Sequence, residues 1–175
     1  MTEFDPAPEP GAPRRRWQER TDTFGRVYDV LLGVTSPTAY TDIADLADCS
    51  PNAAKKHLDR LVEMGIARAE KASRPATYER NEGYLEWQEA SRIATDLSVE
   101  EIIERVEALE ARRSEYETEF VTTDPTDVSV FDHETHDAIH ERMAAVSDWQ
   151  GVIRDARLYE LARRLAQNDG HLIPA

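Results

Sequence analysis

The stretch TDIADLADCSPNAAKKHLDRLVEMG, residues 41–65, predicts two helices separated by a short turn. Thr41 can cap the first helix, whose apolar residues recur at helical spacing. Ser50 can cap the second helix, and Pro51 suits its first position, where the missing N–H does no harm. Gly65 is the residue type that most often ends a helix. We therefore expect a helix, a three-residue turn and a second helix.

The residues on either side extend this pattern. Residues 66–81 alternate between apolar and polar side chains around the basic turn ASRPA, and so predict a two-stranded β-hairpin. A further helix is expected ahead of the quoted stretch, from about Glu19 to Leu32, because apolar residues recur there at helical spacing. The predicted fold is therefore mainly α with a small β-hairpin over residues 18–81.

A helix, a short turn, a second helix and a hairpin together make a winged helix-turn-helix. In this arrangement the second helix, here about residues 50–64, lies in the DNA major groove, and the hairpin contacts the backbone or the minor groove. Asparagine can pair with adenine, lysine with guanine, and the alanine methyl group can contact thymine. The candidate DNA-binding residues are Ser50, Pro51, Asn52, Ala53, Lys55, Lys56, His57 and Arg60 on the helix, and Arg68, Lys71 and Arg74 on the hairpin.

The distribution of charge supports this interpretation. The 175 residues carry 35 acidic and 21 basic side chains, for a net charge of −14, yet residues 41–81 hold seven of each. The chain has three lysines, Lys55, Lys56 and Lys71, and all lie in the predicted second helix or hairpin. Few lysines and many carboxylates are typical of proteins adapted to molar salt, where charge repulsion is screened. The default alternative for the lysine pair is a solvated helix face.

Residues 20–81 resemble a known family. The run TDIADLADCSPNAAKKHLDRLVEMGIARAE is similar to the winged helix-turn-helix of ArsR/MarR-type transcriptional regulators, in the acidic form found in haloarchaea. The resemblance implies that the residues just after the serine cap, from Pro51 to His57, read the major groove. Metal-sensing members of that type use a cysteine-rich motif. This chain has only Cys49, so the resemblance does not extend to metal sensing.

Residues 82–175 are expected to form a helical dimerisation region. Ser98 and Glu101 match a capping box that opens a long helix. Its apolar residues follow a coiled-coil spacing interrupted by one arginine, and they are Ile102, Val106, Leu109, Tyr116 and Phe120. We expect this seam to hold a homodimer, because dimers match palindromic operators. The alternative is that the seam packs against later helices of the same chain.

The rest of the sequence indicates a cytoplasmic protein without membrane contact. Residues 1–17, rich in proline, alanine and acid, predict a disordered tail. The sequence has no apolar run long enough to span a bilayer, and its N-terminus lacks the apolar stretch of a signal peptide. A single cysteine, Cys49, leaves no intrachain disulfide and fits a reducing compartment.

We expect neither a cofactor nor catalytic activity. The sequence contains no glycine-rich phosphate loop, nucleophile elbow or metalloprotease motif. His136 and His140, with His133 one turn earlier, are weak candidates for metal ligands, because no cysteine and no H-E-x-x-H spacing supports them. The predicted function is a sequence-specific DNA-binding transcriptional regulator. The alternative is a protein–protein adaptor that uses the same fold without specific DNA binding.

Overall fold

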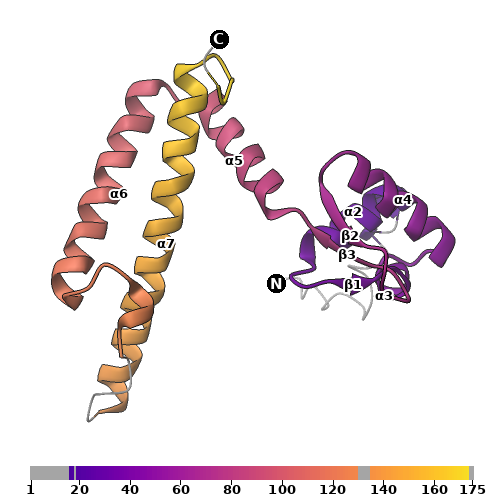
Figure 1. Ribbon diagram of the computed structural model, residues 1–175, viewed down its shortest axis with the longest axis horizontal. Helices are drawn as coiled ribbons and strands as arrows, with labels where there is room; N and C mark the ends of the chain where they lie inside the picture. Colours follow the sequence, from indigo (N-terminus) through magenta and orange to yellow (C-terminus); the bar gives the residue numbers. More distant parts are fainter. Residues whose placement is uncertain (1–15, 18, 130–134, 174–175) are drawn as a thin grey trace, which may run out of the picture. The chain divides into compact units, whose positions relative to one another are not determined.

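Two compact units make up the structure, a computed structural model that describes residues 16–17, 19–129 and 135–173 (Figure 1). One unit ends at Tyr84 and the other begins at Leu85. The chain is mainly helical and has a small three-stranded antiparallel sheet. Among the described helices, none is both long and apolar enough to cross a membrane. Residues 1–15 of the predicted tail lie outside the described residues, and Arg16 and Trp17 are helical.

Helix α2 (Thr23–Gly33) begins later than the sequence predicts. The side chain of Asp22 accepts a hydrogen bond from the backbone N–H of Gly25 at 2.7 Å and so caps the helix. Because the backbone of Asp22 is extended, no continuous helix can run from Glu19 into α2. Glu19 and Arg20 are helical, as predicted, but Asp22 separates them from α2, so the single helix expected from about Glu19 to Leu32 is interrupted.

Helix α3 (Tyr40–Leu46) follows directly after a two-residue strand, β1 (Thr38–Ala39). The strand holds the backbone extended up to Ala39, which takes the N-cap position without a side-chain hydrogen bond. The capping role predicted for Thr41 is therefore wrong, because Thr41 already lies inside the helix.

A tight turn joins α3 to α4 (Pro51–Glu63). Asp48 adopts a left-handed backbone with a φ of 51°, and the N–H of Cys49 donates to the carbonyl of Ala44 at 3.0 Å. This pairing closes the end of α3 in the manner of a Schellman motif. The short turn predicted between the two helices is confirmed.

Helix α4 has the ends that its sequence predicts. The hydroxyl of Ser50 accepts a backbone hydrogen bond at 3.2 Å, and Pro51 occupies the first helical position. At the other end Gly65 has a φ of 78°, and the N–H of Ile66 donates to the carbonyl of Leu61 at 2.9 Å. Local chemistry therefore sets both ends of this helix.

The predicted hairpin is present, but it belongs to a three-stranded sheet. Strands β2 (Ala67–Glu70) and β3 (Thr77–Arg80) pair antiparallel, with Ala69 opposite Tyr78. β1 pairs with the other side of β3, which gives the order β1-β3-β2. The two-stranded hairpin is confirmed, and β1 is an addition that the sequence does not reveal, because a two-residue strand is too short to show alternation.

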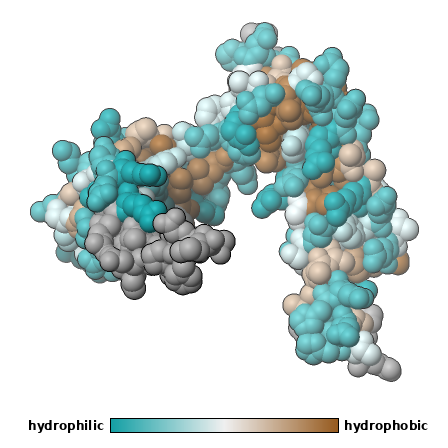
Figure 2. Space-filling view, turned by 180° about the vertical axis from the view of Figure 1, so that it is seen from behind, coloured by the Kyte–Doolittle hydropathy of each residue, from teal (hydrophilic) through white to brown (hydrophobic). Residues whose placement is uncertain are grey.

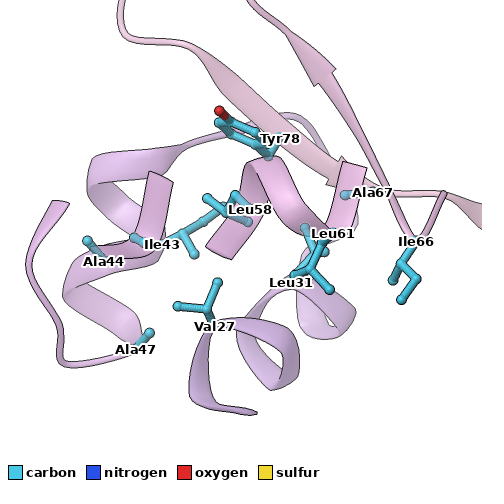
Figure 3. Packing of buried hydrophobic residues seen from close by; sticks show 11 residues of the cluster. Val27, Leu31, Ile43, Ala44, Ala47, Leu58, Leu61, Ile66, Ala67 and Tyr78 are labelled. Carbon is cyan, nitrogen blue, oxygen red and sulfur yellow. The ribbon is translucent and has the colours of Figure 1, made fainter. Parts of the chain in front are cut away.

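One apolar core unites the helices and the sheet of the first unit. Figure 3 shows side chains from α2, α3, α4 and the strands pointing toward one another around Leu58. Tyr78 reaches this core from β3 and is fully buried. The buried residues of the cluster are Val27, Leu31, Ile43, Ala44, Ala47, Ala54, Leu58, Leu61, Ile66, Ala67 and Tyr78.

The residues that follow the sheet are helical, as predicted. They form α5 (Glu82–Asp96), α6 (Val99–Phe120), the short 3-10 helix η1 (Pro125–Asp127) and α7 (His136–Gln167). The predicted capping box is confirmed, because the N–H of Ser98 donates to Glu101 Oε2 at 2.9 Å and the N–H of Glu101 donates back to Ser98 Oγ at 3.3 Å.

Helix α6 packs antiparallel against the longer helix α7 (Figure 1). Ile102, near the start of α6, shares a buried cluster with Leu165 near the end of α7. Leu109 packs further along against Val152 and Ala156. In Figure 2 the outer surfaces of these long helices are largely teal, and brown residues gather in patches along them.

Aromatic rings continue the same contact toward the end of α6. The rings of Phe120 and Trp149 are nearly parallel, with centroids 5.6 Å apart, and Tyr116 stacks 6.1 Å from Trp149. Val106 of the predicted seam is half-buried. The seam is thus occupied by α7 of the same chain, the second of the two arrangements that the sequence allows. A homodimer stays a prediction, and Ile102 and Leu109 are not free to form its interface.

Candidate nucleic-acid interface

The outward face of α4 is set by the side chains that the helix buries. Ala54, Leu58 and Leu61 are fully buried in the core of the first unit. The side chains on the opposite side of the helix are therefore directed to solvent. The exposed polar residues of this face are Asn52, Lys55, Lys56, Arg60 and Glu63, while Ala53, His57 and Asp59 are half-buried.

Asp59 binds two of the three lysines at the edge of α4 that faces the hairpin. Lys55 Nζ lies 2.9 Å from Asp59 Oδ2, and Lys71 Nζ, which comes from the hairpin, lies 3.1 Å from Asp59 Oδ1. The hydroxyl of Tyr78 donates to Oδ1 of the same carboxylate at 2.9 Å. We call these four residues the Asp59 cluster. It joins α4 to β3 and to the residue that directly follows β2, and it is anchored by the buried ring of Tyr78.

The hydrogen bonds of this cluster shift the pKa of both acids. Partial burial acts to raise the pKa of Asp59, but hydrogen bonds from Lys55, Lys71 and Tyr78 outweigh it and lower the pKa to about 2. Burial and the neighbouring Asp59 carboxylate raise the pKa of Tyr78 to about 12. Asp59 is therefore ionised, and Tyr78 is protonated, throughout the physiological pH range.

The opposite edge of α4 faces α2 through Phe24. The ring of His57 meets the ring of Phe24 edge-on, with centroids 5.6 Å apart. The guanidinium carbon of Arg60 lies 5.6 Å from the centroid of the same ring. Both predicted DNA-binding residues therefore have a packing partner within the unit, although Arg60 stays exposed.

The centre of the face lies between these two edges. Helical spacing places Asn52, Lys56 and Glu63 there, within one stripe. Across the described parts of the chain, no hydrogen bond or ion pair engages these three side chains. Asn52 and Lys56 therefore keep their full hydrogen-bonding capacity for a partner outside the chain.

The DNA-binding residues predicted on the hairpin do not all lie beside α4. Lys71 lies beside it, because it forms an ion pair with Asp59 of that helix. Arg68 pairs with Glu79 across the hairpin, one position from the Ala69–Tyr78 pair that faces α4. Because successive strand residues point to opposite faces, Arg68 points away from α4. Arg74 is exposed in the turn between the strands.

The predicted metal candidates come from α7. The rings of His136 and His140 have centroids 4.5 Å apart, and His133 lies outside the described residues. Within the described ranges, no group of three or more histidine, cysteine, aspartate or glutamate residues is arranged to hold a metal ion. Cys49 is half-buried in the turn before α4, and burial raises the pKa of its thiol.

Three residues of the candidate site, Asp59, Tyr78 and Phe24, were not predicted from the sequence to belong to it. A spacing of four residues between Lys55 and Asp59 could have signalled an ion pair on one helix face. The contacts of Asp59 with Lys71 and Tyr78 had no such signal, because they depend on how the hairpin docks against α4.

Comparison with known proteins assigns a family. Residues 21–165 match the model of a family of unknown function, DUF7342, and the chain belongs to that family. None of the curated proteins matches the sequence.

Proposed function

We propose that this member of the DUF7342 family is a sequence-specific, DNA-binding transcriptional regulator. Its first unit acts as a winged helix-turn-helix, in which α4 reads the major groove and the β2–β3 hairpin contacts the backbone or the minor groove. The proposal includes a cytoplasmic location and a likeness to haloarchaeal regulators of the ArsR/MarR type.

The central stripe of α4 carries this proposal. Asn52 and Lys56 are exposed and have no partner among the described residues, on a helix whose other side is fixed by three fully buried residues. A rigid helix that presents unpartnered donors and acceptors is what direct readout of base edges requires. Asn52 can pair with adenine and Lys56 with guanine.

Charge supports the same conclusion. Residues 82–175 contain 22 acidic and nine basic side chains, whereas residues 41–81 contain seven of each. A DNA backbone would meet strong repulsion on the acidic half but little on the balanced one. Counterion release contributes little at molar salt, so base-edge contacts have to supply much of the specificity.

The direct test is selection of binding sites from random duplex DNA in molar KCl. Wild-type protein is expected to enrich one sequence motif. Asn52→Ala should change the base preferred at one position, at about 1–3 kcal/mol per lost bidentate contact. Gln88→Ala removes an exposed amide from α5 and should leave the motif unchanged. Uniform weakening on all sequences by Asn52→Ala would contradict direct readout.

We also propose that the regulator is a homodimer, because paired half-sites in DNA match a two-fold axis in the protein. Its interface would lie outside the α6–α7 contact, which the chain fills by itself. Light scattering in molar KCl measures this directly, and a monomer mass would contradict the dimer.

A protein–protein adaptor is the second candidate. It is favoured by the Asp59 cluster, in which one carboxylate offsets part of the charge of Lys55 and Lys71 and makes the face less basic. An adaptor would enrich no DNA motif, and Asn52→Ala would instead weaken a complex with a co-purified protein.

A further inference from the structure

Two lysines from different elements meet at one carboxylate in the Asp59 cluster. Lys55 comes from α4 and Lys71 from the hairpin, and each contacts a different oxygen of Asp59. The side chains of the lysines are 47% and 63% exposed, against 29% for Asp59. The carboxylate therefore lies beneath the two ammonium groups, which face solvent.

The two ammonium groups have unused hydrogen-bonding capacity. Each has three N–H donors, and within the described residues each makes its polar contact to Asp59. A phosphodiester offers acceptor oxygens with a single negative charge. We propose that Lys55 and Lys71, held from beneath by Asp59, form one site for a single phosphate of the DNA backbone where the hairpin meets α4. This inference rests on the proposed function.

Asp59 is the positioning residue of this site. Its carboxylate is fixed by the hydroxyl of the fully buried Tyr78, so its own place is set by the core. Through it, two long and flexible side chains are ordered before DNA arrives, and binding then loses less side-chain entropy. Two lysines and one aspartate leave a net charge of one, which matches one phosphate.

Preordering matters most where salt weakens electrostatic attraction. At molar salt the release of counterions from DNA contributes little to binding. A phosphate contact then depends on geometry that is already in place, which the Asp59 cluster supplies. Binding weakens as salt rises, and each phosphate that a protein neutralises makes the negative slope of log K against log salt steeper by about 0.9. The slope therefore counts the phosphates bound.

The first test measures that slope on duplex DNA for the wild type and for Lys55→Gln, Lys71→Gln and the double variant. One shared phosphate predicts that the double variant reduces the magnitude of the slope by about 0.9 in total, and that the two single changes in affinity are not additive. A fall of about 1.8, with additive changes, would mean two separate phosphates and would overturn the shared site.

The second test separates positioning from simple charge. Asp59→Asn removes the charge but keeps an acceptor for Tyr78, and is expected to weaken binding to every duplex by about fivefold through lost preordering. Glu86→Gln is the charge-matched control, because it removes one exposed acid from α5, outside the α4 face, and it should not weaken binding. Asp59→Glu keeps the negative charge and should therefore retain most of the affinity that Asp59→Asn loses. Tighter binding by Asp59→Asn would show that Asp59 competes with DNA and would overturn its positioning role.

Failure of this inference differs from failure of the proposed function. If the folded wild-type protein binds no duplex DNA, the proposed function fails and this site fails with it. If the wild type binds DNA but the double lysine variant keeps the full slope, only the phosphate site is wrong. Far-ultraviolet circular dichroism of each variant confirms the fold, and the lysine test does not depend on Asp59→Asn.

Discussion

The unit that ends at Tyr84 and the unit that begins at Leu85 bury their apolar side chains differently. In the first, three helices and a sheet surround one continuous core centred on Leu58. In the second, α6 and α7 meet along a line, and the buried residues fall into separate small groups around Ile102 and Leu109. An enclosed core holds its surface residues in fixed places, whereas a linear contact between two helices can shift to fill a gap.

The two units also differ in their basic residues and in how these residues form ion pairs. All three lysines belong to the first unit, whereas from Glu82 onward the chain has nine arginines and no lysine. Several of those arginines pair with acids one turn away on their own helix, as Arg92 does with Glu89. In the first unit, Lys71 instead meets Asp59 across two elements. The candidate site therefore lies where rigid packing can hold charges from separate elements together.

The largest expected effect comes from the enclosed core. Leu58→Ala should lower the free energy of unfolding of the first unit by about 4 kcal/mol, because its surroundings come from several elements and cannot collapse into the cavity. Hydrogen exchange in molar KCl, followed by mass spectrometry, would locate the loss to residues 23–80. Leu46→Ala, at a leucine that is 57% exposed, is the control and should change stability by less than about 0.5 kcal/mol.

The same substitution in the linear contact should cost less. Leu109→Ala is expected to lower the free energy of unfolding of the second unit by about 2 kcal/mol, because α6 and α7 can close part of the gap. The measurement is the same hydrogen exchange experiment, read over α6 and α7. A loss equal to that of Leu58→Ala would remove the contrast between the two units.

A smaller effect is expected at the capping box of α6. Ser98→Ala removes the acceptor for the N–H of Glu101 and should lower stability by about 1 kcal/mol, with faster exchange confined to the first turn of α6. Ser114→Ala, at an exposed position within the same helix, is the matched control and should not lower stability, because alanine favours a helix interior at least as well as serine. Equal losses in both variants would show that the cap contributes nothing of its own.

The smallest effect concerns pH and the Asp59 cluster. The folded-state pKa of Asp59, about 2, lies below its ordinary value of 3.8, so its contribution to stability is present above that value and is lost as pH falls from about 4 to 2. The contribution should be less than about 1 kcal/mol, since the side chain is partly exposed. Urea unfolding of wild type and Asp59→Asn should differ above pH 4 and converge below it. A constant difference would contradict the lowered pKa.

Much of the helical architecture could be predicted from the sequence, because its signals are local. Ser50, Pro51 and Gly65 set the ends of α4 through their own backbone and side-chain chemistry, and Ser98 with Glu101 does the same for α6. The apolar periodicity alone does not show where α2 starts, because Asp22 caps the helix and separates it from the residues before it. β1 was missed because its pairing partner, β3, lies far along the chain.

The candidate site shows the same division. The sequence by itself determined which residues α4 turns outward, because a period of 3.6 residues and a buried stripe of Ala54, Leu58 and Leu61 leave no other choice. Only the tertiary structure decided that Lys55 and Lys71 share one carboxylate, that Arg68 points away, and that the seam of α6 is filled by α7. These outcomes depend on which elements dock, and docking joins residues whose separation along the chain carries no periodic signal.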